Sequence, residues 1–331
     1  VSGSGIGTNS YITAILSPTT FQLSQNATAS ATVTLNSFGG LTLNNTTYGL
    51  GGYNGSSAGD VNLYSGNLNL FFSNTNTGVN GTQGQQFNNQ VIKIGNENTD
   101  GITLNLRGPS TIYVNQGLVS SNSTSGQGNI IQVGALNLTN TTVTLGGGNL
   151  YRLRAAGPIS ILGSQITFQT NQNDGPSGAL ELTGKISGSG AITKFGDGIL
   201  RGIVISNPNN TYSGGTNIVA GDVQVTATTG SALGTGSINV FPDGSLRIAG
   251  NGSINGSKLT VMSRVNALGA VVLDDNFNPT VLTSSNFSSV YNTALQLGQP
   301  YFTQALNMSA IGDGRAFLGG GLNGEIAYTA A

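Results

Sequence analysis

The stretch that decides the fold is residues 182–226, LTGKISGSGAITKFGDGILRGIVISNPNNTYSGGTNIVAGDVQVT, which continues to residue 251 as ATTGSALGTGSINVFPDGSLRIAGN. Short runs rich in Val and Ile, such as Ile199–Ile205 and Val223–Val225, alternate with clusters of Gly, Asn, Asp and Ser. β-branched residues favour strands, whereas these small and polar residues favour turns. The stretch therefore predicts several short strands separated by turns.

The same rhythm extends over most of the chain, for example at Val61–Tyr64, Ile130–Leu138 and Ser245–Ile248. Strands come two or three together, in coils of roughly 20–25 residues, which is the repeat length of a solenoid. Tight Asn-Gly hairpins account for few of the connections. We therefore predict an all-β parallel β-helix, with an antiparallel β-sandwich as the alternative.

Composition divides the chain into three predicted parts. Residues 1–60 are an irregular, Gly-rich N-terminal cap or arm, residues 61–275 are the β-solenoid, and residues 276–331 are a C-terminal segment with final strands. Within that last part, Ser284–Leu297 is the best helix candidate, because its apolar residues recur at helical spacing.

Composition also excludes several classes of function. Only 7% of the 331 residues are charged, against roughly 25% in an average globular protein, and the net charge is −1. A nucleic-acid surface is therefore not expected. The chain has no Cys and no His, which removes disulfides, thiolate metal sites and His-based triads. No apolar run reaches the ~20 residues of a membrane span, and no cofactor is indicated.

Residues 182–251 closely resemble the passenger-associated repeat of bacterial autotransporters. That repeat combines a Gly-x-Gly pair, a Leu-x-Lys-x-Gly-x-Gly-x-Leu run, an Asn-x-Tyr-x-Gly-Gly-Thr core and an Ala-Gly-x-Leu end. The matching residues are Gly188, Gly190, Ile192, Lys194, Gly196, Gly198, Leu200, Asn210, Tyr212, Gly214, Gly215, Thr216, Ala220, Gly221, Ala232, Leu233, Gly234 and Gly236. The match covers about 70 residues, and it departs from the repeat at Val223, which replaces a Leu, and in a longer stretch before Asn210.

This resemblance implies right-handed parallel β-helix coils in a passenger displayed outside the cell. It therefore implies a secreted or cell-surface protein. Because the chain has no His and only twelve Asp and Glu, we expect an adhesive or matrix scaffold without enzymatic activity. Near-zero net charge and open strand edges favour self-association, so a homo-oligomer or filament is expected. Glycans or proteins of a host or matrix are the other expected partners.

Two alternatives to a scaffold remain open. A β-helix enzyme acting on polysaccharide would use clustered carboxylates, for which Asp274 and Asp275 beside Arg264 are the candidates. A glycan-binding module would use solvent-facing tyrosines, for which Tyr151, Tyr212 and Tyr301 are the candidates.

Calcium sites are a weaker possibility. Asp-Gly occurs within the triplets at 196–198, 242–244 and 312–314, and Asp and Gly in that order favour turns. The tandem calcium-binding nonapeptide is absent from the sequence. We therefore interpret these triplets as turns.

Overall fold

The computed structural model describes part of the chain. Backbone and most side chains are described for residues 60–71, 91–94, 101–115, 128–148, 150–170, 180–196, 202–248, 259–264, 267–273, 306–309 and 311. At 12–17, 20–23, 35–37, 41–44, 293–297, 301–302, 316–320 and 327–328 the strands are described without their side chains, except for the exposure of Leu318. The chain divides into two compact units, the first made of residues 1–160 and 173–180 and the second of residues 161–172 and 181–331.

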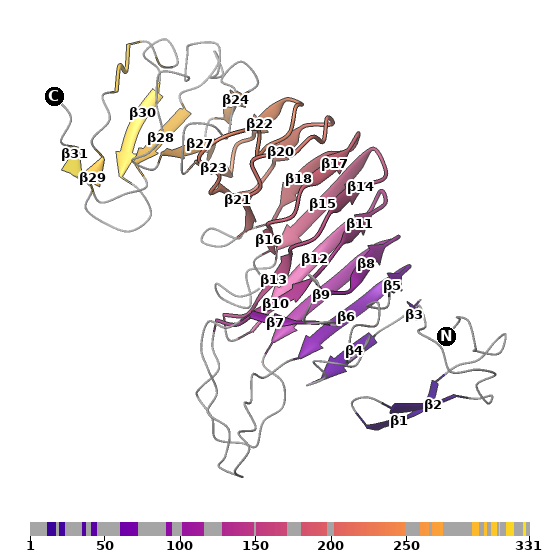
Figure 1. Cartoon of the computed structure of the whole chain (residues 1–331). Coiled ribbons are helices and arrows are strands. Elements are labelled where there is room, and N and C mark those ends of the chain that lie inside the picture. The colour runs from indigo at the N-terminus through magenta and orange to yellow at the C-terminus, as the bar shows by residue number, and fades with distance from the viewer. Residues whose placement is uncertain are drawn as a thin grey trace. The chain divides into compact units, whose positions relative to one another are not determined.

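The first unit is built from parallel strands that pair in register from one coil to the next (Figure 1). One sheet holds β3 (Leu35–Ser37), β5 (Asp60–Leu63), β8 (Thr103–Leu106), β11 (Leu136–Leu138) and β14 (Ile159–Ile161). A second holds β4 (Leu41–Asn44), β6 (Gly66–Phe71), β9 (Ser110–Asn115) and β12 (Thr142–Gly147). A third holds β7 (Val91–Lys93), β10 (Ile130–Val133) and β13 (Arg152–Ala155). Apart from these sheets, β1 (Ile12–Ser17) and β2 (Thr20–Leu23) form an antiparallel pair.

The second unit repeats this arrangement. One row of parallel strands holds β15 (Gln165–Thr170), β18 (Ala191–Phe195), β20 (Thr216–Ile218), β22 (Ile238–Val240) and β24 (Leu259–Val261). Another holds β16 (Leu180–Leu182), β19 (Ile203–Ile205), β21 (Gly221–Val225), β23 (Gly244–Ile248), β27 (Ala270–Leu273), β28 (Thr293–Leu297) and β30 (Ala316–Gly320). The remaining strands are β17 (Ile186–Gly188), the antiparallel pair β25 (Ser263–Arg264) and β26 (Ala267–Leu268), and the parallel pair β29 (Tyr301–Phe302) and β31 (Ala327–Tyr328).

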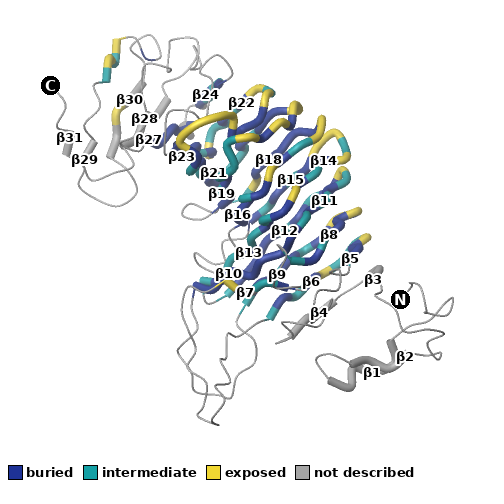
Figure 2. Tube along the Cα trace, viewed as in Figure 1, coloured by how far each residue is buried: buried dark blue, intermediate teal, exposed yellow. Residues whose placement is uncertain are grey.

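The core consists of columns of apolar side chains stacked along the coils. Alternate residues of a strand point inward, so buried and partly exposed positions alternate along it (Figure 2). In the first unit, Leu63, Leu106 and Leu138 occupy one register column and are fully buried. Each added coil extends such columns, so a strand of three residues suffices as a structural element.

These observations confirm the predicted parallel β-helix and exclude the sandwich alternative for the three large sheets, in which every described strand pair is parallel. The helix predicted at Ser284–Leu297 is wrong over its last five residues, which form β28. There the backbone pairs in register with β27, Ala294 against Ala270 and Leu297 against Leu273. A neighbouring coil supplies these ladder bonds, and they outweigh the weak helical spacing. Residues 284–292 lie outside the described part.

In the part of the chain that the structure describes, no helix is both long enough and apolar enough to cross a membrane.

Candidate functional site: the repeat segment at residues 182–251

The repeat segment forms strands β17 to β23 of the second unit, and several of its polar residues are turned into the coil interior. Of the residues predicted to carry the repeat, Gly198 and Leu200 lie outside the described residues. The others occupy strands or the turns between them. Their contacts show what each one does in the fold.

Lys194 occupies an inward position. It lies in one register column with Phe168 of β15 and Ile218 of β20, and its side chain is fully buried. Its Nζ donates to Thr170 Oγ1 at 2.9 Å and to the carbonyl oxygens of Phe195 at 2.9 Å, Gly196 at 2.7 Å and Ala220 at 3.3 Å. These acceptors offset the loss of hydration of a buried ammonium group.

Lys194 thereby joins three successive coils. Thr170 lies one coil before it and Ala220 lies one coil after it, 24 and 26 residues away in sequence. Its own carbonyl oxygen accepts a hydrogen bond from the backbone N–H of Val219. The Lys194 side chain therefore connects neighbouring coils through hydrogen bonds.

Asn210 performs a similar role on another side of the coil. Its Oδ1 accepts a hydrogen bond from the backbone N–H of Ile186 at 2.7 Å, and its Nδ2 donates to the carbonyl oxygen of Ala232 at 2.6 Å. The side chain is 2% exposed. One amide therefore satisfies a buried donor of the preceding coil and a buried acceptor of the following coil.

The backbone around Asn210 continues the stack without forming a strand. The N–H groups of Thr211 and Ser213 donate to the carbonyl oxygens of Ile186 and Gly188, and the N–H of Thr235 donates to that of Tyr212. These bonds have the spacing of a parallel ladder. The Asn-x-Tyr core is thus an irregular side of the coil that Asn210 holds in register.

Tyr212 and Thr216 form a buried polar pair. The Tyr212 hydroxyl and Thr216 Oγ1 are 2.7 Å apart, and both side chains are fully buried. Burial raises the pKa of the Tyr212 phenol, and the hydrogen bond to Thr216 offsets only part of that effect. The pair closes the turn that leads from the irregular side into β20.

Glycines of the repeat stand where coils approach most closely. A Cβ on Gly214 would lie 2.3 Å from the backbone N of Ala191 and from the carbonyl C of Gly190. Backbone atoms cannot yield to such a contact, so only Gly fits there. The repeat glycines with positive φ are Gly188, Gly196, Gly215, Gly221 and Gly234. Leu233, beside the last of these, is buried in the core.

Asparagines also pair across coils on the outer faces. Asn137 Nδ2 donates to Asn105 Oδ1 at 2.7 Å in the first unit, and Asn239 Nδ2 donates to Asn217 Oδ1 at 2.9 Å in the second. In each case the two residues are register partners in adjacent parallel strands. Like residues stacked in this way stabilise one register over its alternatives.

Two of the three tyrosines predicted to bind glycans are placed differently from the prediction. Tyr151 and Tyr212 are 0% exposed, so the prediction that they face solvent is wrong. Each hydroxyl has a neighbouring polar side chain in the interior, Asn129 for Tyr151 and Thr216 for Tyr212, and this lets the ring be buried. Tyr301 lies in β29, and its side chain is outside the description.

The predicted catalytic candidates are not brought into a described site. Asp274 and Asp275 lie outside the described residues, and the side chain of Arg264 in β25 does too. Among the described residues, no group of three or more acidic, Cys or His side chains could hold a metal ion. Asp243 of the triplet at 242–244 is an exposed turn residue with φ 76°, so the interpretation of this triplet as a turn is confirmed.

No protein-family model matches the chain, and searches of curated proteins and of solved structures found no match. Lys194, Asn210 and Tyr212 all bond groups inside or between coils. Their arrangement supports the coil stack, which is a structural role.

Proposed function

We propose that the protein is a secreted or cell-surface β-solenoid of the autotransporter-passenger type, which acts without catalysis as an adhesive scaffold and assembles with copies of itself. The observation that carries this proposal is the parallel, in-register pairing of successive coils. A terminal coil presents the same row of backbone donors and acceptors that each inner coil uses, and such an edge can pair with another chain.

The low charge of the chain supports association. Its net charge is −1, so copies repel one another only weakly. The amide pairs Asn105–Asn137 and Asn217–Asn239 show the kind of side-chain contact that forms when two coils pair in register. Extracellular placement and the passenger type rest on the repeat at residues 182–251.

The proposal is tested by imaging the purified protein by negative stain and by sedimentation velocity over a range of concentrations. Elongated oligomers that grow with concentration are expected. A matched pair of variants tests the edge route. Leu318 is 43% exposed in β30, the last strand in its sheet among the described residues, whereas Leu162 is 61% exposed in a turn after β14.

Leu318→Lys places a charge on the strand edge and should shift the protein toward monomers, because edge charges oppose pairing with another chain. Leu162→Lys should assemble like the parent protein. Compact monomers of the parent protein at every concentration would overturn the proposal, and equal assembly of the two variants would exclude β30 as the pairing edge.

A further inference from the structure

The outer face of β6 and β9 in the first unit carries two aromatic side chains and three asparagines, Asn67, Asn69 and Asn115. The inward residues Leu68, Leu70, Ile112 and Val114 are buried, so the residues between and beyond them face outward. Register pairs Asn69 with Tyr113 and Phe71 with Asn115. Aromatic and amide residues therefore alternate both along and across the strands over these four residues. We call Asn69, Phe71, Tyr113 and Asn115 the β6–β9 platform.

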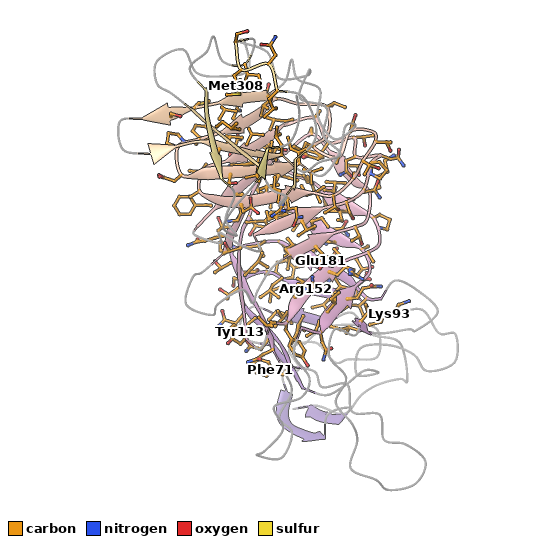
Figure 3. The ribbon with its side chains drawn as sticks, turned by 90° about the vertical axis from the view of Figure 1, so that its left-hand side faces the viewer. Phe71, Lys93, Tyr113, Arg152, Glu181 and Met308 are labelled. Atoms are coloured by element: carbon orange, nitrogen blue, oxygen red, sulfur yellow. The ribbon has the colours of Figure 1, made fainter. Side chains whose placement is uncertain are left out.

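The two rings of the platform contact each other edge to face. Their centroids are 6.0 Å apart and their planes are at 87° (Figure 3). Both side chains are only partly buried. The mutual contact holds the rings in one arrangement, which lowers the entropy lost when a ligand stacks on them.

On the side of β12, the residues next to Tyr113 and Asn115 are glycines, which have no side chains. Gly146 is the register partner of Tyr113, and the N–H of Gly148 donates to the carbonyl oxygen of Val114. A Cβ on Gly148 would lie 2.6–2.8 Å from the amide atoms of Asn115. The Asn115 amide thus lies against the backbone of Gly148, in a position that any side chain there would disturb.

The chemistry of the platform is neutral. Strands β6, β9 and β12 read GNLNLF, STIYVN and TVTLGG and contain no Asp, Glu, Lys or Arg. A charged partner would find no complementary charge in these strands. A sugar ring has apolar C–H faces and a rim of hydroxyls that both donate and accept hydrogen bonds, and an amide can do both as well.

We propose that Phe71 and Tyr113, with Asn69 and Asn115, bind a neutral glycan. A pyranose face lies against the face of one ring, the other ring flanks the sugar at nearly a right angle, and the two amides bind its hydroxyls. With residues i and i+2 about 6.7 Å apart along a strand and strands about 4.8 Å apart, the platform matches a sugar ring in scale. The inference rests on the adhesive part of the proposed function and is independent of self-association. No covalent bond is made or broken in this binding.

The test uses the full chain on a microarray of neutral oligosaccharides of glucose, galactose and N-acetylglucosamine, printed beside sialylated and uronic-acid oligosaccharides. Hits are titrated in solution. Tyr113→Ala and Asn115→Ala remove a ring and an amide, and Tyr64→Ala removes an exposed aromatic of the same unit outside the platform. Circular dichroism verifies that each variant is folded.

Binding of a neutral oligosaccharide is expected, with affinity at least about tenfold lower for Tyr113→Ala, about threefold or more lower for Asn115→Ala, and unchanged for Tyr64→Ala. Three results would overturn the proposal: no neutral oligosaccharide is bound, only charged ones are bound, or Tyr64→Ala weakens binding as much as Tyr113→Ala. Oligomers seen without glycan binding would refute this site alone, and glycan binding by a monomer would refute self-association alone.

Discussion

Removing the Asn210 side chain tests how the coils are held in register. Asn210→Ala deletes two buried hydrogen bonds and leaves the Ile186 N–H and the Ala232 carbonyl without the amide that now bonds them. Each buried group left unsatisfied costs about 1–3 kcal/mol, so we expect the free energy of unfolding to fall by about 2–6 kcal/mol. Asn210→Asp keeps the acceptor for Ile186 but turns a carboxylate oxygen toward the Ala232 carbonyl, and it should also destabilise the protein.

The matched control is Asn217→Ala. Asn217 is also an asparagine bonded across coils, but it lies half-buried on an outer face, where water can replace the lost contact. Its loss should cost about 0.5–1.5 kcal/mol. Both variants are measured by urea denaturation followed by far-UV circular dichroism. Because solenoids can unfold coil by coil, hydrogen exchange of the Ile186 amide is measured as a local readout.

Asn210→Ala should lower the urea midpoint more than Asn217→Ala and should speed exchange of the Ile186 amide. If the two alanine variants have equal midpoints and the Ile186 amide stays protected, Asn210 does not hold the coils together, and the structural role assigned to it is refuted.

Three further perturbations address neighbouring contacts. Lys194→Met keeps the stem of the side chain but removes every hydrogen bond of Nζ, and the urea midpoint should drop by the equivalent of about 3 kcal/mol or more. Because burial raises the pKa of Tyr212 above its ordinary value of 10.0, the unfolded state loses that phenol proton first, and the free energy of unfolding falls as pH rises past 10. Tyr212→Phe should make that alkaline decline shallower, and an identical pH profile for the variant and the parent would contradict this reasoning. Gly214→Ala forces a Cβ against the backbone of Gly190, so its thermal midpoint should fall by the equivalent of about 1–3 kcal/mol, and a midpoint equal to that of the parent protein would contradict the close approach.

The strand rhythm and the parallel coils could be predicted from sequence because they depend on local patterns. Short β-branched runs and Gly- or Asn-rich turns recur at the length of a coil, and the structure confirms the parallel pairing. The strand β28 was missed because its residues also fit helical spacing. Its pairing with β27 makes this segment a strand and not a helix, and the sequence of either segment alone does not show that pairing.

The β6–β9 platform was also missed, although the sequence carries a signal for it. In both strands every second residue is apolar and faces the core. Phe71 and Tyr113 occupy the alternate positions, which face outward, and so do the neighbouring asparagines. What the sequence does not show is the register that brings the two rings within 6.0 Å of each other. Two of the tyrosines predicted instead, Tyr151 and Tyr212, are buried, because partners on nearby segments satisfy their hydroxyls.

By itself, the sequence determined the class of fold and the places where the chain must turn, because strand preference, alternation and glycine spacing act over a few neighbouring residues. Only the tertiary structure decided which polar residues face inward. Lys194, Asn210 and Tyr212 would each be placed in water by their polarity alone. Lys194 and Asn210 are buried because acceptors and donors on coils 22 to 26 residues away meet their polar atoms, and Tyr212 is buried because the folded turn brings Thr216 to its hydroxyl.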